Sequence, residues 1–302
     1  MPSSSEQNRH RHSSHPLRKR FDAWYQQQMY LPAGHPRKLA ASTALSFLDR
    51  FSTGVVLYED PDIIVINKPA GLPSHGSDYG VSELVQVARA SSDIHVVHRL
   101  DRDTTGVLML GKSREARGAM ASQFDRTQGE KTAVKTYLAL ARGEWDPVLR
   151  GFIGPLEVGG KLVRVVDPTE DAERREVRIQ ANGKRLEEKM SSTGIHVVAH
   201  LRDNNGQMWS LLAIDLYTGR THQIRVTADY LGGSLMGDPQ YGPDATDPVS
   251  GQMLHAYSLT INMPQTGERK TFKASLPKDF QRILRGLKRV RTFGSPYEEV
   301  LV

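Results

Sequence analysis

Short apolar runs separated by turns rich in Gly, Pro, Asp and Asn dominate the chain from about residue 54 onward. The first two runs, at 55–58 and 63–67, flank an acidic Asp-Pro turn and predict a β-hairpin. Further β-branched or Leu-rich runs predict strands at 95–97, 107–110, 135–141, 209–219, 254–262 and 271–274. Short strands joined by hairpins, with few helices between them, favour an α+β fold with a mixed, mainly antiparallel central sheet.

A few helices interrupt this series of strands. One is predicted from Ser82 to about Ala90, with Ser82 as its N-cap, and a second from the cap Ser113 to about Arg126. The segment THQIRVTADYLG reads as a turn that leads into a third helix, which we expect to start near Thr221 because threonine is an N-capping residue type.

The ends of the chain and one internal stretch differ from the rest. We expect residues 1–50 to form a basic, partly disordered extension, 51–290 a catalytic domain and 291–302 a tail. The first 20 or so residues carry too little apolar surface to fold, and 21–51 are expected to pack as an irregular extension. A basic arm for a phosphate backbone, an organelle transit peptide and a solvated tail all fit this start. The charged stretch 151–195 is expected to form peripheral hairpins or a mobile insertion.

Composition narrows the possible chemistry. The 302 residues include no cysteine, which excludes disulfides, zinc-thiolate sites, iron-sulfur clusters and a cysteine nucleophile. With 38% hydrophobic and 25% charged residues, and no apolar run near the roughly 20 residues that span a bilayer, we expect a soluble, cytoplasmic protein. The formal net charge of +6 favours polyanions, so nucleic acid is the first partner to consider.

Two polar clusters follow apolar runs and carry the candidate chemistry. The first, in HVVHRLDRDTTGVLMLG at 95–111, places His98, Arg99 and Asp101 at a strand end. Alone, such an Arg-x-Asp pair is more often a surface ion pair than a catalytic group. The second cluster is YTGRTHQIRV at 217–226, whose polar residues are Arg220, His222, Gln223 and Arg225. Phosphate contact or a solvated helix face would also account for it.

Together these clusters carry a resemblance to a known family. NKPAGLPSH at 67–75, HRLDRDTTG at 98–106, KTYLA at 135–139, YTGRTHQIRV, GDPQYG at 237–242 and LHAYSLTI at 254–261 stand in the order typical of the RluA-type pseudouridine synthases. The chain resembles that family from about residue 54 to 280. The resemblance implies an RNA pseudouridine synthase that isomerises specific uridines in ribosomal or transfer RNA.

The resemblance also implies roles for individual residues. Asp101 falls on the catalytic aspartate, Tyr137 on the active-site tyrosine that faces the target uracil, and Arg225 on the arginine that pairs with the aspartate. Arg99 matches the arginine that fills the gap left by an extruded base. We further expect RNA contact or base flipping from the remaining polar residues of the motifs, which are Lys68, His98, Arg220, His222 and Gln223.

These roles fit the reaction. Moving uracil from its nitrogen to its carbon glycoside requires detaching the base, so a carboxylate must stay ionised as nucleophile or as stabiliser of a cationic sugar. A guanidinium lowers the pKa of a neighbouring aspartate and cannot itself lose its proton. The target nucleotide must leave the stack before it can react. The residues leave open whether the intermediate is a sugar ester or an adduct at the base.

The chain departs from the family pattern at several positions. Thr105 stands where the family usually has Ser, Thr227 where it has His, and Gly233 and Ser234 where it has His-Pro. These changes put substrate choice in doubt more than the reaction. The residues ahead of the core are too few for the family's N-terminal S4 RNA-binding module, so RNA affinity is expected from the core and the basic extension.

Other functions fit parts of the sequence. DRDTTG at 101–106 also fits the nucleophile loop of a haloacid-dehalogenase phosphatase, with Asp103 as acid and base and a required Mg²⁺. A non-catalytic RNA-binding module and a metal site built from His95, His98 and His222 are further alternatives. We expect a synthase that needs no cofactor and no metal, has RNA as its partner, has no obligate protein partner and acts as a monomer.

Overall fold

The computed structural model of the chain divides into two compact units. Unit 1 comprises Met1–Ala133 with Ser258–Ser275, and unit 2 comprises Val134–Tyr257 with Leu276–Val302. The residues described are 15–76, 79–124, 132–149, 151–159, 162–165, 187–242, 247–249 and 251–301. The predicted catalytic segment 51–290 therefore contributes to both units. The expected α+β class with a mainly antiparallel sheet is confirmed.

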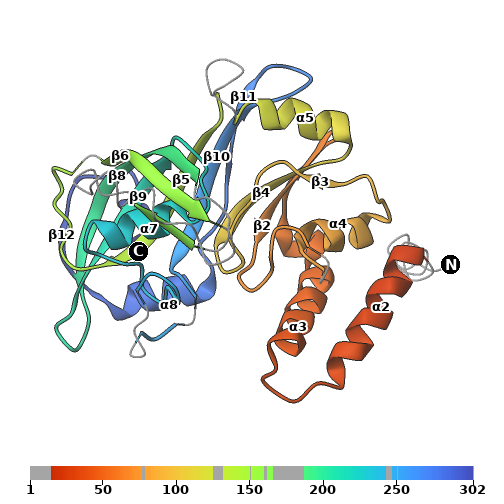
Figure 1. The fold of residues 1–302 in the computed structure, drawn as a ribbon, viewed down its shortest axis with the longest axis horizontal. Helices are drawn as coiled ribbons and strands as arrows, with labels where there is room; N and C mark the ends of the chain where they lie inside the picture. The colour runs from red at the N-terminus through yellow and green to blue at the C-terminus, as the bar shows by residue number, and fades with distance from the viewer. Residues whose placement is uncertain are drawn as a thin grey trace. The chain divides into compact units, whose positions relative to one another are not determined.

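The strands of unit 1 surround the first polar cluster. They are β1 (Val56–Glu59), β2 (Ile63–Lys68), β3 (His95–Val96), β4 (Thr105–Gly111), β11 (Arg269–Lys273) and the second half of β10 (Leu254–Asn262). The predicted hairpin of β1 and β2 is confirmed, and β2 continues antiparallel along β4 until Lys68 lies opposite Gly106. Figure 1 shows the strands β2, β4, β10 and β11. Apolar side chains of these strands form the core of this unit.

Helices α4 (Val81–Arg89) and α5 (Arg114–Ser122) follow two of these strands. The predicted cap of α5 is confirmed, because Ser113 Oγ accepts a hydrogen bond from the amide of Ala116 at 3.0 Å. Gly80, rather than Ser82, is the N-cap of α4, and Ser82 lies buried inside the first turn. Arg126, the expected end of α5, lies outside the described residues.

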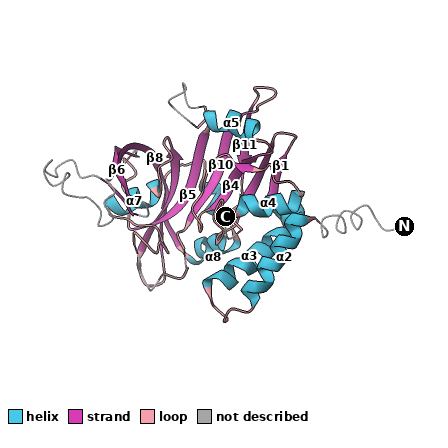
Figure 2. Ribbon diagram, turned by 45° about the vertical axis from the view of Figure 1, so that its right-hand side comes forward, coloured by secondary structure: helices cyan, strands magenta, loops and turns pink. Residues whose placement is uncertain are grey.

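The irregular extension expected for 21–51 is instead a pair of helices, α2 (Pro16–Met29) and α3 (Pro36–Asp49), followed by a π-helical turn, η1 (Phe51–Val55). Both helices begin at a His-Pro pair. The Nδ1 atoms of His15 and His35 accept a hydrogen bond from the amide two residues on, and the fixed φ of proline suits the first helical position. Figure 2 shows α2, α3 and α4 packed together, which buries Phe21 and Phe47 completely.

The strands of unit 2 are longer and form one antiparallel series. They are β5 (Val134–Arg142), β6 (Gly151–Gly159), β7 (Leu162–Val165), β8 (Glu187–Arg202), β9 (Met208–Leu216) and β12 (Lys288–Thr292). Along the sheet the order is β5, β9, β8, β6 and β7, and β12 pairs with the end of β8. Leu138, Leu140, Leu211 and Trp209 belong to a core that Phe280 completes from helix α8 (Lys278–Gly286). Part of the charged stretch 151–195 is thus regular sheet, while its segment 167–176 lies outside the described residues.

Helical segments complete the described part of unit 2. Helix α7 (Gln223–Tyr230) begins two residues later than the expected Thr221, since His222 takes the N-cap position with a φ of 51°. Helix α8 (Lys278–Gly286) and strand β12 have no counterpart among the sequence predictions. The expected tail also contains a short 3₁₀ turn, η3 (Glu298–Leu301), and its apolar residues pack on the core of the unit. None of the described helices combines the length and the apolar character needed to cross a bilayer.

Candidate active site

A loop that follows β2 holds the turn that carries Asp101. Ser74 is 3% exposed, and its Oγ donates to the carbonyl of Leu100 at 2.7 Å and accepts from the amide of Leu100 at 2.8 Å. The loop is itself tied to the start of α4, because the amides of Val81 and Ser82 donate to the carbonyls of Pro73 and Ser74 at 2.9 and 3.1 Å. The residue directly before Asp101 is therefore fixed at both of its backbone groups.

The residues after Asp101 are held by the same loop. Lys68 Nζ donates to the carbonyls of Arg102 at 2.7 Å and Pro69 at 2.8 Å. The amide of Gly71, which has a φ of 84°, donates to Asp103 Oδ1 at 3.2 Å. Within the turn the amide of Thr104 donates to the carbonyl of Asp101 at 3.2 Å. These hydrogen bonds fix the backbone around Asp101. The residue itself is half-buried, and its side chain keeps some access to solvent.

Lys68 was predicted to contact RNA, but it is completely buried. Burial lowers the pKa of its ammonium to about 7, against the raising effect of the charges on Asp103 and Asp101. An amine with no exposed surface, bound to two backbone carbonyls, cannot also reach a phosphate. Its position assigns Lys68 to holding the turn of Asp101.

The other predicted residues of this turn differ in exposure. Arg99 is exposed, as a side chain that enters RNA must be. His98 is half-buried, with its Nε2 accepting from the amide of Met109 at 3.3 Å and its ring 5.2 Å from that of Phe124. His98 thus contacts β4 and Phe124, which lies two residues beyond the end of α5, and a direct contact between His98 and RNA stays a prediction.

The second polar cluster lies in unit 2 and centres on a buried ion pair. Arg225 Nε and Nη2 donate to the carboxylate of Asp238 at 2.7 and 2.8 Å, and the two residues are 5% and 0% exposed. The guanidinium of Arg225 also lies over the ring of Tyr241, 5.1 Å from its centroid. The THQIRV segment and the GDPQYG motif therefore meet in space. Asp238 had no role in the sequence predictions, although the motif that contains it was noted.

The surroundings of Asp238 keep it ionised. Burial alone would raise its pKa, but hydrogen bonds from Arg225 and from the amides of Gln240 and Tyr241, with the charge of Arg225, hold the pKa below its ordinary value. Tyr241 extends the cluster to His222, whose Nδ1 lies 2.9 Å from the tyrosine hydroxyl. Arg225 is thereby fixed in direction by a carboxylate and an aromatic ring.

Gln223 was also predicted to contact RNA, but the protein uses all of its hydrogen-bonding capacity. Its Oε1 accepts from Thr218 Oγ1 and the amide of Arg220, and its Nε2 donates to the carbonyl of Ser192 and to Thr193 Oγ1. A primary amide can make four such bonds, and Gln223 is only 2% exposed. It therefore holds the turn at 218–220 against β8 instead of binding RNA.

The remaining predicted residues of unit 2 lie on separate elements. Tyr137 is 4% exposed on β5, opposite Ile214 of β9. Arg220 is exposed at the turn before α7. In short, the structure groups Lys68, His98, Arg99 and Asp101 in unit 1, and His222, Gln223 and Arg225 in unit 2. Sequence reasoning missed Ser74 and Asp238, although both stand inside motifs that had been recognised.

Two of the departures from the family pattern occupy tightly packed positions. A Cβ on Gly233 would lie 2.2 Å from Trp145 Nε1 and 2.5 Å from the carbonyl oxygen of Arg142, so the indole takes the space of a larger residue there. Thr227 is 1% exposed, and within the described residues its Oγ1 has no hydrogen-bond partner.

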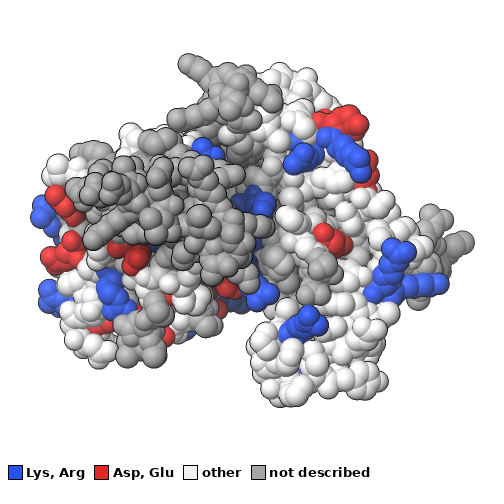
Figure 3. All heavy atoms as spheres, viewed as in Figure 1, with Lys and Arg blue, Asp and Glu red and all other residues white. Residues whose placement is uncertain are grey.

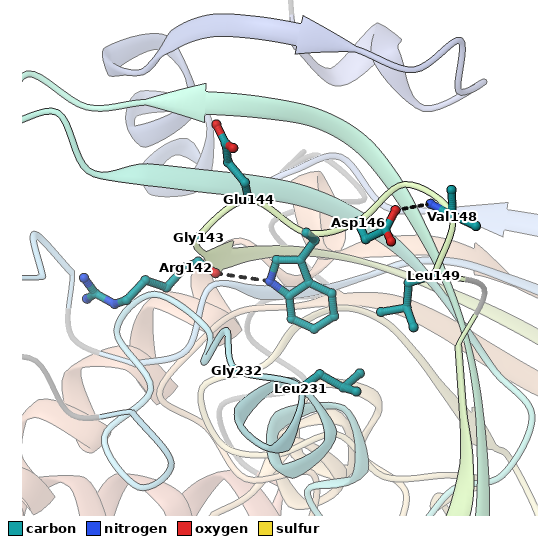
Figure 4. Close-up of a pocket in the computed structure, with 9 residues that line it drawn as sticks. Arg142, Gly143, Glu144, Asp146, Val148, Leu149, Leu231 and Gly232 are labelled. Atoms are coloured by element: carbon teal, nitrogen blue, oxygen red, sulfur yellow. Dashed lines mark hydrogen bonds between the residues drawn. The ribbon is translucent and has the colours of Figure 1, made fainter.

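Trp145 and Gly232, which precedes Gly233, also line a cavity of about 460 Å³, shown in Figure 4. Its wall combines the edge of the Trp145 indole with apolar side chains such as Leu149 and Leu231 and with the charged Arg142, Glu144 and Asp146. None of the site residues predicted from the sequence lines this cavity.

The phosphatase alternative requires Mg²⁺, and another alternative requires a metal bound by histidines. Among the described residues, no three His, Asp or Glu side chains come close enough together to hold a metal ion. His95 and His222 belong to different units, and His95 instead contacts Asp93 at 2.7 Å.

The chain is similar to known proteins over most of its length. A family model described as RNA pseudouridylate synthase matches residues 62–230. A Bacillus subtilis protein named uncharacterized RNA pseudouridine synthase YlyB is 32% identical over 252 residues, covering 78% of this chain and 73% of that protein. Ribosomal large subunit pseudouridine synthase C of Escherichia coli K12 is 33% identical over 249 residues, covering 78% and 71%.

Solved structures agree in fold. Human RNA Pseudouridylate Synthase Domain Containing 1 superposes with a TM-score of 0.60 at 23% identity, covering 82% of this chain and 92% of that one. Human RNA Pseudouridylate Synthase Domain Containing 4 gives a TM-score of 0.58 at 22% identity, covering 82% and 98%. At these identities the likeness concerns the fold alone.

Proposed function

Because the chain belongs to the RluA-type RNA pseudouridylate synthase family, and is therefore an isomerase that acts on RNA, we propose that it converts specific uridines of structured ribosomal RNA to pseudouridine. The names of its relatives support ribosomal RNA as the substrate. Transfer RNA is the alternative substrate. Mapping pseudouridines in total RNA from cells with and without the protein distinguishes the two.

In the proposed reaction Asp101 is the catalytic carboxylate. It attacks the sugar, or stabilises a cationic sugar, while the bond between C1' and the uracil nitrogen breaks. The freed base turns and reattaches to C1' through C5, and any ester bond between Asp101 and C1' breaks as this carbon bond forms. C5 then loses its proton, and the ring nitrogen that left C1' gains one, so that Asp101 is regenerated as a free carboxylate. Arg225 is proposed to keep Asp101 ionised, since a guanidinium favours the charged form of a neighbouring carboxylate. Its buried pairing with Asp238 supports this role, because the pair fixes the direction of the guanidinium.

The reacting uridine must first leave the stack, at a cost of a few kcal/mol. We propose that the exposed side chain of Arg99 fills the vacancy and that Tyr137 stacks on the extruded uracil. Arg220 and His222 are proposed to contact the RNA around that nucleotide. Lys68 and Gln223 are left out of this set because of their burial and their internal hydrogen bonds.

The observation that carries the proposal is that hydrogen bonds hold the residues on both sides of Asp101. Leu100 before it and Arg102 and Asp103 after it are each bonded to the loop 68–74. A nucleophile must be held near its attack position before the substrate arrives, and backbone bonds on both sides supply this order. An Arg-x-Asp turn is more often a surface ion pair, and such a pair does not require backbone hydrogen bonds on both sides of the aspartate.

The direct test uses RNA that carries tritium at C5 of its uridines, because glycosidation of C5 releases that atom. Wild-type protein should release tritium without added metal, and Asp101→Asn should release none while still binding RNA. Asp93→Asn is a matched control, since Asp93 is an exposed carboxylate whose contact is with the surface residue His95. Full activity of Asp101→Asn would refute the mechanism.

Asp103 separates this proposal from the phosphatase alternative. A phosphatase of the haloacid-dehalogenase type needs the Asp103 carboxylate as acid and base and is inactivated by EDTA. In a synthase Asp103 only accepts the hydrogen bond of Gly71, which an amide oxygen can also accept. Asp103→Asn should therefore keep most of the tritium release, with EDTA present or absent.

We further propose that the protein acts as a monomer in the cytoplasm. Size-exclusion chromatography with light scattering checks the first part, and cell fractionation the second. A mass of 33.7 kDa in solution is the expected result. A larger mass would contradict the monomer.

A further inference from the structure

The helix and strand near the C-terminus of unit 2, α8 and β12, carry a dense run of basic residues. Between 278 and 291 there are six cations and one carboxylate, and all seven side chains are exposed. They are Lys278, Asp279, Arg282, Arg285, Lys288, Arg289 and Arg291. This segment lies beyond residues 62–230, where the family model matches. Figure 3, drawn in the view of Figure 1, shows described basic side chains spread over this face with acidic ones between them.

The pairing of β12 with β8 brings like charges together. Lys288 lies directly opposite Arg202, the last residue of β8, and both are exposed. Like charges at directly opposed positions of an antiparallel pair are destabilising. The register then shifts between Arg289 and Arg291, so that the strand carries an extra residue at that point. The four cations Arg202, Lys288, Arg289 and Arg291 are named here the basic edge.

Carboxylates of the protein do not neutralise the basic edge. Among the described residues none of the four cations forms an ion pair. The nearby Asp203 accepts bonds from the amides of Asn205 and Gln207 and from the indole of Trp209. Glu298 accepts bonds from two amides of its own turn. The acids around the basic edge are thus committed to other partners.

The contacts of the basic edge orient its side chains without removing their charge. Arg289 donates to the carbonyl of Leu301 at 3.0 Å, and the guanidinium of Arg291 lies 5.0 Å from the ring centroid of Phe293. Arg202 Nε lies 3.2 Å from the sulfur of Met208. Each guanidinium therefore has a defined position and remains available to an anion.

We propose that the basic edge binds the phosphate backbone of the substrate RNA, apart from the nucleotide that reacts. The proposal rests on the proposed function, which makes RNA the ligand of this chain. Protection of an edge strand against pairing with other strands would also favour charged residues. It would not favour placing Lys288 opposite Arg202, where an acidic partner would protect the edge as well and stabilise the sheet. A row of phosphates relieves this repulsion and accounts for the retained charges.

The test is a full-length triple variant, Lys288→Gln, Arg289→Gln and Arg291→Gln. Binding to a fluorescein-labelled RNA stem-loop is measured by anisotropy over a series of salt concentrations. Loss of the phosphate contacts should weaken binding about tenfold or more at low salt and make the slope of log K against log salt shallower by about 2. In the tritium-release assay KM should rise while kcat stays unchanged, because the basic edge does not touch the reacting base.

Two further variants make the result specific. Arg50→Gln, Arg114→Gln and Arg117→Gln remove the same charge at exposed positions of unit 1 and should weaken binding much less. Exchanging Lys and Arg at 288, 289 and 291 keeps the charge and should keep the salt slope. Equal losses in both neutralised variants, or no loss in the first, would overturn the proposal. The binding assay does not depend on turnover. A wild-type protein that binds RNA but releases no tritium would therefore refute the proposed function without contradicting RNA binding by the basic edge.

Discussion

Ser74 Oγ forms a hydrogen bond with each backbone group of Leu100, donating to its carbonyl at 2.7 Å and accepting from its amide at 2.8 Å. One hydroxyl thereby satisfies both the amide and the carbonyl of Leu100, as a neighbouring strand does for a residue within a sheet. Leu100 is the residue before Asp101, and 26 positions of sequence separate it from Ser74. The NKPAGLPSH motif thus supports the HRLD motif directly.

Replacing Ser74 by alanine should lower both stability and turnover. The change leaves two backbone groups of Leu100 without their partner in a buried place, which costs about 1 to 3 kcal/mol. We expect the free energy of unfolding in urea to fall by that amount, and kcat for tritium release to fall while KM for RNA stays near its wild-type value. Ser122→Ala, which removes an exposed hydroxyl that donates to the carbonyl of Ala119, should change neither quantity measurably. An unchanged kcat in a folded Ser74→Ala protein would contradict the positioning role.

Asp238→Asn should be among the most damaging conservative changes in unit 2. It leaves the charge of Arg225 buried beside a neutral amide, and breaking a buried ion pair in this way costs about 3 to 5 kcal/mol. Urea unfolding measures the loss. The matched control is Asp279→Asn, because Asp279 pairs with Arg282 at 3.9 Å on the surface, where such a pair contributes less than about 1 kcal/mol. Similar losses in the two variants would contradict the importance of the buried pair.

The same carboxylate predicts how stability depends on acid. Because the pKa of Asp238 is lowered in the folded protein, its contribution to stability is present above the ordinary aspartate pKa near 4 and is lost as the pH falls below it. The stability difference between wild type and Asp238→Asn should therefore shrink as the pH falls from 5 towards 3. Thermal unfolding at a series of pH values tests this. A stability difference that stays constant or grows as the pH falls would contradict this prediction.

Lys68 predicts a dependence in the alkaline direction. Its pKa of about 7 in the folded protein lies below the value of 10.5 for an exposed lysine, so between these values the unfolded chain binds more protons. The contribution of Lys68 to stability should rise as the pH increases from 7 to 9 and stay level below 7. The free energy of unfolding of wild type, minus that of Lys68→Met, isolates this contribution. A difference that stays level over the same range would show that the buried amine stays charged.

Gly233→Ala should destabilise unit 2 although it adds a single methyl group. That group would lie 2.2 Å from the indole nitrogen of Trp145, and the indole is held by a 3.1 Å bond to the carbonyl of Arg142. Overpacking of this kind typically costs about 1 to 3 kcal/mol. Urea unfolding should show the loss, and Trp145→Leu in the same chain should reduce the added cost of Gly233→Ala. The control is Gly54→Ala, because a Cβ at that position would have no atom within 4 Å. Gly267→Ala is not suitable, because Gly267 has a positive φ.

Local signals in the sequence predicted most of the strands correctly, because alternating or β-branched apolar runs bounded by turns have few other uses in a folded chain. The hairpin of β1 and β2, strand β5 and the cap of α5 followed directly. Helices α2 and α3 were not predicted, although each starts at a His-Pro pair in which the histidine is the N-cap and the proline is the first helical residue. Helix α8 lies inside the predicted catalytic segment 51–290 but was not recognised as a helix, and β12 crosses the expected boundary at residue 290.

The sequence by itself determined the family, through motifs in a fixed order, and singled out Asp101 as a carboxylate at a strand end. Tertiary structure decided the roles of the polar residues around it. Lys68 and Gln223 look like RNA contacts in the sequence, but packing buries both and uses their hydrogen bonds inside the protein. Ser74 and Asp238 are important because of the partners that folding gives them, Leu100 and Arg225. A side chain's type sets which bonds it can make, but only the folded chain sets which partners it meets and whether water competes for them.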